Sequence, residues 1–165
     1  MAINVCVADL RVDSARPPLG RLPVPPTAPI ARCHCGNLRA YDDCCGRFHR
    51  GEQPDAAAQL MRARYCAFVL MLEGYLLQTW HPSTRPPDLC LADSIGTRWL
   101  GLDMKAQAQG GDRAQVEFTA RYRLGSGPAQ QQNEISRFVR EDGIWYYLDG
   151  EFPERKPVLR ALRRA

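Results

Sequence analysis

Residues 33–49 read Cys-His-Cys-Gly-Asn-Leu-Arg-Ala-Tyr-Asp-Asp-Cys-Cys-Gly-Arg-Phe-His, and this stretch decides how the chain begins to fold. Its cysteines lie in two close pairs, and a glycine follows each pair. A tetrahedral zinc ion takes four thiolate or imidazole donors, and short spacings let a small knuckle supply them with little ordering of the chain. We therefore predict that one zinc ion is bound by Cys33, Cys35, Cys44 and Cys45.

The fourth ligand stays open at this point, because Cys44 and Cys45 are neighbours in the chain and both must face the same ion. His49 is the alternative fourth ligand. Disulfides between the pairs, or reduced cysteines packed as small hydrophobic residues, are interpretations without a metal. Glycines at positions 36 and 46 favour the metal, since glycine permits the tight or left-handed backbone that turns both pairs inward. Four protein donors leave no open coordination position, so we expect a structural rather than a catalytic ion.

The segment after the knuckle predicts a long helix. Asp55 follows a proline and is expected to cap a helix that runs to about residue 72. Apolar residues recur there at spacings of three and four, which is typical of a helix with one broad buried face. Cys66 lies within this helix and is interpreted as a core residue.

Shorter elements follow. Gly74 predicts a bend into a second helix over 75–80, which ends before a proline. A third short helix is expected over 88–95. Alternating apolar and polar residues then predict half-buried antiparallel strands, and Asp142-Gly143 between two of them is a hairpin signal. The expected strands span 98–106, 114–123, 134–140 and 144–148.

These elements divide the chain into four parts: a disordered, proline-rich leader over 1–31, the knuckle over 32–52, a helix-and-sheet domain over 53–153 and a basic tail over 154–165. Seven cysteines and no secretory signal favour the reducing cytoplasm, where such spacings indicate metal. Lys and Arg total 22 against 18 Asp and Glu, and this mild net charge of +4 argues against a nucleic-acid partner. No apolar run is long enough to predict a membrane span.

The pattern Cys33-x-Cys35-Gly36-x7-Cys44-Cys45-Gly46 resembles the SEC-C zinc motif. Later blocks at 60–68, 79–82, 99–102, 136–138 and 142–150 resemble the YchJ-like family, in which a SEC-C motif precedes a nuclear transport factor 2-like domain. The resemblance covers about residues 33–153. It implies an α+β fold: a nuclear transport factor 2-like (cystatin-like) cone of helices packed on a curved antiparallel sheet.

Such a cone leaves a cavity between the long helix and the sheet, and polar and aromatic residues are the candidates to line it. These candidates are Arg64, Trp99, Glu117, Glu134, Arg137, Trp145 and Tyr147. No residue is assigned as catalytic, but His81 and Glu134 are the candidates for proton transfer in an enzyme. His81 next to Pro82 is also interpreted as a residue that caps a helix end.

Two functions follow from these features. The sequence favours a small zinc-binding protein, a binding or adaptor module whose knuckle contacts a protein partner and whose cavity holds either a small molecule or nothing. The alternative is a small isomerase- or hydrolase-like enzyme that uses the cone-shaped cavity, since the same fold supports both classes. The oligomeric state is left open.

Overall fold

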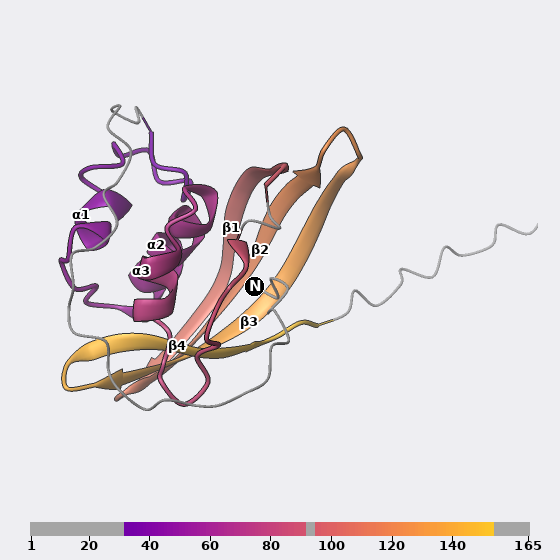
Figure 1. Ribbon diagram of the computed structural model, residues 1–165. Helices are drawn as coiled ribbons and strands as arrows, with labels where there is room; N and C mark the ends of the chain where they lie inside the picture. The colour runs from indigo at the N-terminus through magenta and orange to yellow at the C-terminus, as the bar shows by residue number, and fades with distance from the viewer. Residues whose placement is uncertain (1–31, 92–94, 154–165) are drawn as a thin grey trace, which may run out of the picture.

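A computed structural model describes residues 32–91 and 95–153 of the chain. In these ranges three helices precede four strands: α1 (Cys45–His49), α2 (Ala57–Val69), α3 (Glu73–Gln78), β1 (Thr97–Gly110), β2 (Arg113–Leu124), β3 (Ala129–Glu141) and β4 (Ile144–Glu151). The helices lie together on one side of the sheet (Figure 1). The α+β architecture is therefore confirmed, while the predicted leader and tail fall outside the described residues.

The sheet is an antiparallel meander in the order β1-β2-β3-β4. Strand β2 shows why the sheet has one buried face. Val116 and Phe118 are each 1% exposed, whereas their neighbours Gln115 and Glu117 are exposed to solvent. This alternation matches the period of two along a strand. Register shifts in the β1–β2 and β3–β4 pairs mark bulges, which bend the sheet around the helices.

The predicted hairpin between the last two strands is confirmed. Asp142 and Gly143 have φ values of 50° and 80°, the left-handed backbone that a tight primed turn requires at both central positions. Strands β1 and β3 extend beyond their predicted limits of 98–106 and 134–140. The added residues are mostly Gln, Asn, Ala and Gly, whose weak strand preference is overridden by pairing with β2.

Helix α2 starts one residue later than predicted. Its N-cap position is Ala56, and no side chain caps the helix, so the predicted capping role of Asp55 is wrong. Instead the Oε1 atom of Gln59 accepts a hydrogen bond of 2.9 Å from the backbone N–H of Asp55. The side chain that stabilises the start of α2 therefore belongs to Gln59, within the helix, and it contacts the backbone that precedes the helix.

The helix ends at Val69, and Gly74 is not the bend. Met71 has a φ of 57°, and the N–H of Leu72 donates to the carbonyl of Ala67 at 2.8 Å. These are the marks of a Schellman motif, which ends a helix with one left-handed residue. Gly74 lies inside α3, so the second helix begins earlier than the predicted range 75–80.

Of the helix predicted over 88–95, residues 88–90 are not helical, whereas Leu91 has 3₁₀-helical geometry. Cys90 has a φ of 47°, and its N–H donates to the side-chain Oδ1 of Asp88 at 2.6 Å. An aspartate that accepts from the backbone two residues later forms an Asx turn, which competes with a helix. Residues 92–94 of this prediction lie outside the described ranges.

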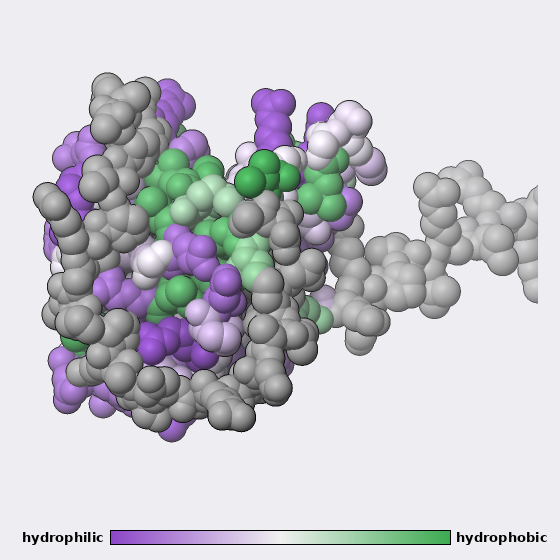
Figure 2. Space-filling model, viewed as in Figure 1, coloured by the Kyte–Doolittle hydropathy of each residue, from purple (hydrophilic) through white to green (hydrophobic). Residues whose placement is uncertain are grey.

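One hydrophobic core joins the knuckle, α2, α3 and the sheet. Where α3 ends, the chain runs beside β4: the N–H of Tyr147 donates to the carbonyl of Thr79 at 2.9 Å, and the N–H of His81 donates to the carbonyl of Tyr147 at 2.8 Å. Hydrophobic residues also gather between the helices and the sheet on the surface seen in Figure 2. The helical layer is therefore held to the sheet by packing and by backbone hydrogen bonds.

Candidate functional site

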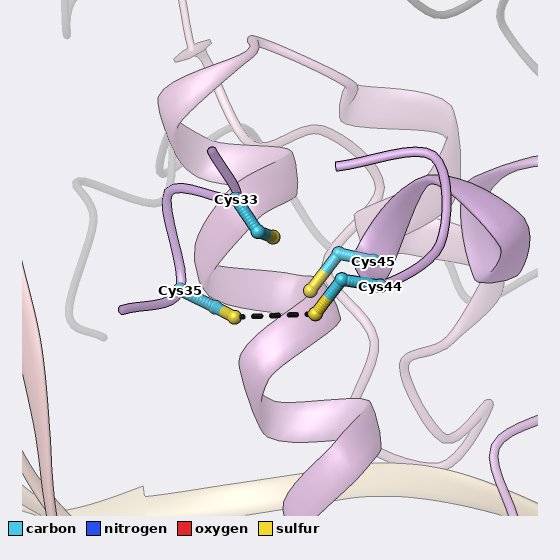
Figure 3. A group of neighbouring side chains, drawn as sticks. All are labelled: Cys33, Cys35, Cys44 and Cys45. Atoms are coloured by element: carbon cyan, nitrogen blue, oxygen red, sulfur yellow. Dashed lines mark hydrogen bonds between the residues drawn. The ribbon is translucent and has the colours of Figure 1, made fainter. Parts of the chain in front are cut away.

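Four cysteine thiols converge at the end of the molecule that carries α1. Cys33 and Cys35 lie in the loop before α1, Cys44 immediately precedes that helix, and Cys45 is its first residue. Their Sγ atoms all lie within 4.8 Å of one another, and all four side chains are buried. Figure 3 shows the sulfur atoms pointing toward a common centre from the two segments. The group is a candidate metal site.

Two glycines shape the knuckle for different reasons. Gly36 has a φ of 85°, and its N–H donates to the carbonyl of Cys33 at 3.3 Å, so it closes the tight turn that the sequence predicts. Gly46 does not have the left-handed backbone expected of it. It is required instead by close packing, since a Cβ atom there would lie 2.9 Å from the carbonyl oxygen of Tyr41.

The sulfur geometry fits a tetrahedral ion. At a zinc–sulfur distance of about 2.3 Å, tetrahedral geometry places sulfur atoms about 3.8 Å apart. The Sγ atoms of Cys35 and Cys44 are 3.6 Å apart. Contacts with the thiols of Cys35, Cys45 and Cys66 lower the pKa of Cys33, because they donate to its thiolate. The same contacts raise the pKa of Cys45, so the case for a metal rests on the sulfur geometry.

His49, the alternative fourth ligand, is engaged elsewhere. Its Nε2 atom lies 2.9 Å from the carbonyl of Ala63, and its Nδ1 atom lies 2.7 Å from the hydroxyl of Tyr41. A carbonyl only accepts, so Nε2 carries the hydrogen and Nδ1 accepts from the hydroxyl. Burial lowers the pKa of His49 to about 4, which keeps the ring neutral. The geometry therefore favours Cys45 over His49 as the fourth ligand.

The knuckle packs directly on α2. The Nη1 atom of Arg62 donates to the carbonyl of Cys35 at 2.7 Å, and the Sγ atoms of Cys33 and Cys66 are 3.5 Å apart. Cys66 is fully buried, which confirms the predicted core position. The sequence did not predict that Cys66 contacts the thiol cluster of the knuckle. A single cysteine in a helix carries no local signal of such a contact, which depends on the way α2 meets the knuckle.

The described residues line a small cavity between α2 and the sheet. Its volume is about 10 Å³, which is the space for one water molecule. Its walls combine apolar, aromatic and charged side chains: Met61, Arg64, Phe68, Trp80, Glu134 and Tyr147. Three of the predicted cavity residues therefore lie where expected, but around a much smaller space.

Arg64 is 2% exposed and crosses this interior. Its Nη1 atom donates to the carbonyl of Leu76 at 2.7 Å and to the hydroxyl of Thr79 at 2.8 Å. The guanidinium lies 4.5 Å from the ring centre of Tyr147 and 5.1 Å from that of Trp80. Burial lowers its pKa to about 10. These contacts join α2, α3 and β4, which is a structural role.

Glu134 is fully buried on β3. Its Oε1 atom accepts hydrogen bonds from the hydroxyls of Ser136 at 2.6 Å and Tyr147 at 3.2 Å. The other proton-transfer candidate, His81, belongs to a separate group at the surface: its ring nitrogens lie 2.6 Å from the Oγ atom of Ser83 and 3.0 Å from a carboxylate oxygen of Glu141. The structure does not bring His81 and Glu134 together.

The other predicted cavity residues lie away from this space. Trp145 is buried, and its Nε1 atom donates to the carbonyl of Asp55 at 3.2 Å, while Trp99 is half-buried against aromatic rings of α2 and β2. Contrary to expectation, Glu117 and Arg137 are exposed, because strand alternation turns both to the outer face. They do not line the interior of the cone.

Arg137 instead donates from Nη2 to Asp149 at 2.7 Å. It also borders an open groove of about 620 Å³ at the end of β1 and the start of β2. Arg113 and Phe138 also line this groove. The groove and the interior of the cone are therefore separate features.

A family model described as the YchJ middle, nuclear transport factor 2-like domain matches residues 56–150. The chain belongs to the YchJ-like family. The match spans α2 to β4, and the cysteine cluster with its SEC-C motif precedes it. In the described part of the chain, no helix has the length and apolar character needed to cross a membrane.

Relatives of this YchJ-like chain match it over about three quarters of its length and over nearly their own full length. A UPF0225 protein of Xanthomonas campestris is 52% identical over 125 residues, which cover 75% of this chain and 97% of the relative. A UPF0225 protein of Cupriavidus metallidurans is 54% identical over 132 residues, covering 75% of this chain and 91% of the relative. Neither name states an activity.

Solved structures agree with the fold. A SEC-C motif containing protein from Rhodopseudomonas palustris has a TM-score of 0.68 and 35% identity, covering 74% of this chain and 99% of that protein. Another from Psychrobacter arcticus has a TM-score of 0.63 and 29% identity, covering 76% of this chain and 84% of that protein. Both support a SEC-C motif followed by a nuclear transport factor 2-like domain.

Proposed function

We propose that the chain is a zinc-binding protein in which the ion has a structural role and the molecular surface carries a binding or adaptor function. The observation that supports this proposal is the convergence of four buried thiols within 4.8 Å of one another. Tetrahedral sites with sulfur donors suit zinc, and four thiolates would hold it without an open position for a substrate. The ligands would be Cys33, Cys35, Cys44 and Cys45.

The ion would tie together two segments of the chain. One segment is the loop with Cys33 and Cys35, and the other is the start of α1. Both also pack on α2 through Arg62 and His49. Metal binding would therefore stabilise the whole fold and fix the orientation of the loop between the two cysteine pairs.

The small size of the cavity around Arg64 and Glu134 supports a binding role over catalysis by these two residues. A cavity of about 10 Å³ holds one water, whereas pockets for small molecules measure about 300–1,000 Å³. The charged groups around this cavity are held by hydrogen bonds and ring contacts within the protein. We therefore place the function at the surface of the protein.

We propose that a protein partner contacts the loop over 36–43, which the zinc ion would hold rigid. Leu38 in this loop is 84% exposed, the largest exposed fraction among the big apolar side chains of the described residues. A rigid, projecting apolar side chain suits insertion into an apolar pocket of a partner. Leu38→Asp should abolish co-purification of the partner without loss of zinc, while Leu124→Asp, at a 52% exposed position on β2, should leave it unchanged.

Native mass spectrometry of the protein as purified from cells tests the proposal as a whole. The intact chain should carry one zinc ion and no further mass, and denaturation should release that ion. A retained organic molecule would contradict a function confined to protein binding at the surface. A chain without metal, purified under reducing conditions, would contradict the zinc site.

A further inference from the structure

The thiol cluster contains a fifth member that the four-cysteine motif does not include. Cys66 lies on α2, is fully buried, and has its Sγ atom 3.5 Å from that of Cys33. This separation is close to the spacing of about 3.8 Å expected between two thiolates on one tetrahedral ion. It also matches the 3.6 Å that separates Cys35 from Cys44, a pair within the motif.

The contacts of Cys66 reach beyond Cys33. The thiols of Cys35 and Cys45 also lie in the surroundings of Cys66, where they affect its pKa, and the Sγ atoms of Cys33, Cys35 and Cys45 all lie within 4.8 Å of one another. Cys44 has a different environment: its thiol contacts Cys35 and receives a hydrogen bond of 3.5 Å from the side-chain amide of an exposed asparagine. Three cysteines are thus shared by two overlapping groups of four.

Cys44 and Cys66, which each belong to only one of the two groups, differ in how deeply they are buried. Cys44 is 7% exposed, the highest value in the cluster, whereas Cys66 is 0% exposed and held within α2. Thiols are modified according to their exposure as well as their thiolate character, and by exposure Cys44 is the ligand most open to alkylation, oxidation or exchange. A fifth thiol on the opposite, inner side could take its place without moving the other three ligands far.

We propose that Cys66 is a reserve metal ligand, so that the ion can be held either by Cys33, Cys35, Cys44 and Cys45 or by Cys33, Cys35, Cys45 and Cys66. This inference rests on the proposed zinc site and adds a fifth donor to it. The ion would pass from one set to the other by exchange of a single ligand, with four thiolates bound in each state. The site would then retain its metal when Cys44 is blocked.

Cobalt substitution tests this proposal, because the intensity of the sulfur-to-cobalt charge-transfer band reports the number of bound thiolates. The Cys44→Ser variant should bind one cobalt ion with the band of four thiolates. The Cys44→Ser/Cys66→Ala double variant should show the weaker band of three thiolates and bind zinc roughly a hundredfold more weakly than Cys44→Ser. Cys66→Ala alone, the matched control, should keep four thiolates through Cys44.

A three-thiolate band in Cys44→Ser, equal to that of the double variant, would overturn the proposal and leave the four-cysteine site intact. A wild-type chain that binds neither cobalt nor zinc would instead overturn the proposed function itself. If Cys44→Ser does not fold, alkylation of Cys44 in the wild-type protein, located by peptide mapping, replaces the substitution. Retention of one metal after that alkylation is expected, and its release would refute the reserve ligand.

Discussion

Replacing Arg64 with methionine tests whether the interior of the cone is a packed core or a binding site. Methionine keeps an unbranched stem but removes the guanidinium. That group donates to the carbonyl of Leu76 and to the hydroxyl of Thr79, and it lies 4.5 Å from the ring centre of Tyr147. All of these contacts would be lost together.

The magnitude follows from those contacts. Two hydrogen bonds from a charged donor and one desolvated cation–ring contact contribute about 5–8 kcal/mol. Burial opposes this gain: it lowers the pKa of Arg64 to about 10 from 12.5, which corresponds to about 3 kcal/mol against the charged form. We therefore expect Arg64→Met to lower the free energy of unfolding by about 3 kcal/mol. Arg64→Ala should be worse by about 2 kcal/mol, because it also leaves a cavity.

Urea denaturation of the zinc-loaded protein at pH 7 measures the difference, with the midpoint expected to fall while the slope stays constant. Arg121→Met, at an exposed position of β2, is the matched control and should change stability by less than about 0.5 kcal/mol. An Arg64→Met variant that is as stable as the wild-type chain, or more stable, would refute the reasoning. It would indicate an arginine kept for function at the expense of stability.

In thermal unfolding, Gly46→Ala should lower the free energy of unfolding by about 1–3 kcal/mol, because the new Cβ would lie 2.9 Å from a carbonyl oxygen. The control Gly110→Ala should not change stability, because nothing lies within 4 Å of its new Cβ. The pKa of His49 is lowered from 6.5 to about 4 in the folded protein. As the pH falls, His49 therefore takes up a proton at a higher pH in the unfolded chain than in the folded one, and the free energy of unfolding should decrease between pH 6.5 and pH 4. In urea unfolding, His49→Gln should show a shallower dependence on pH in that window, and an equal slope would contradict this assignment. Chelation of the metal should lower the Tm of helices and sheet together, since knuckle and domain share one core; an unchanged Tm would show that they are independent.

Local patterns carried most of the fold. The alternation along β2 predicted which side chains face the helices, because a strand has only two faces. Asp142-Gly143 predicted its turn, because few residue pairs adopt left-handed backbone at both positions. In the knuckle, the spacing of cysteines around Gly36 predicted a cluster that the structure does contain.

What the sequence did not reveal depends on contacts between distant segments. Gly46 is explained by the approach of Tyr41, and the end of α2 by the backbone of Met71, a residue with no intrinsic preference for that conformation. Cys66 joins the thiol cluster only because α2 packs on the knuckle. Arg64 reaches from α2 to the rings of Trp80 and Tyr147. None of these contacts leaves a periodic or local signal.

X-ray absorption at the zinc edge, on protein purified from cells under reducing conditions, tests the central claim most directly. The account predicts one zinc ion per chain surrounded by four sulfur atoms at about 2.3 Å. A shell with nitrogen in place of one sulfur would assign His49 as a ligand and contradict the hydrogen bonds that hold its ring. The absence of bound zinc, or a shell made mainly of oxygen, would contradict the zinc-binding function as a whole.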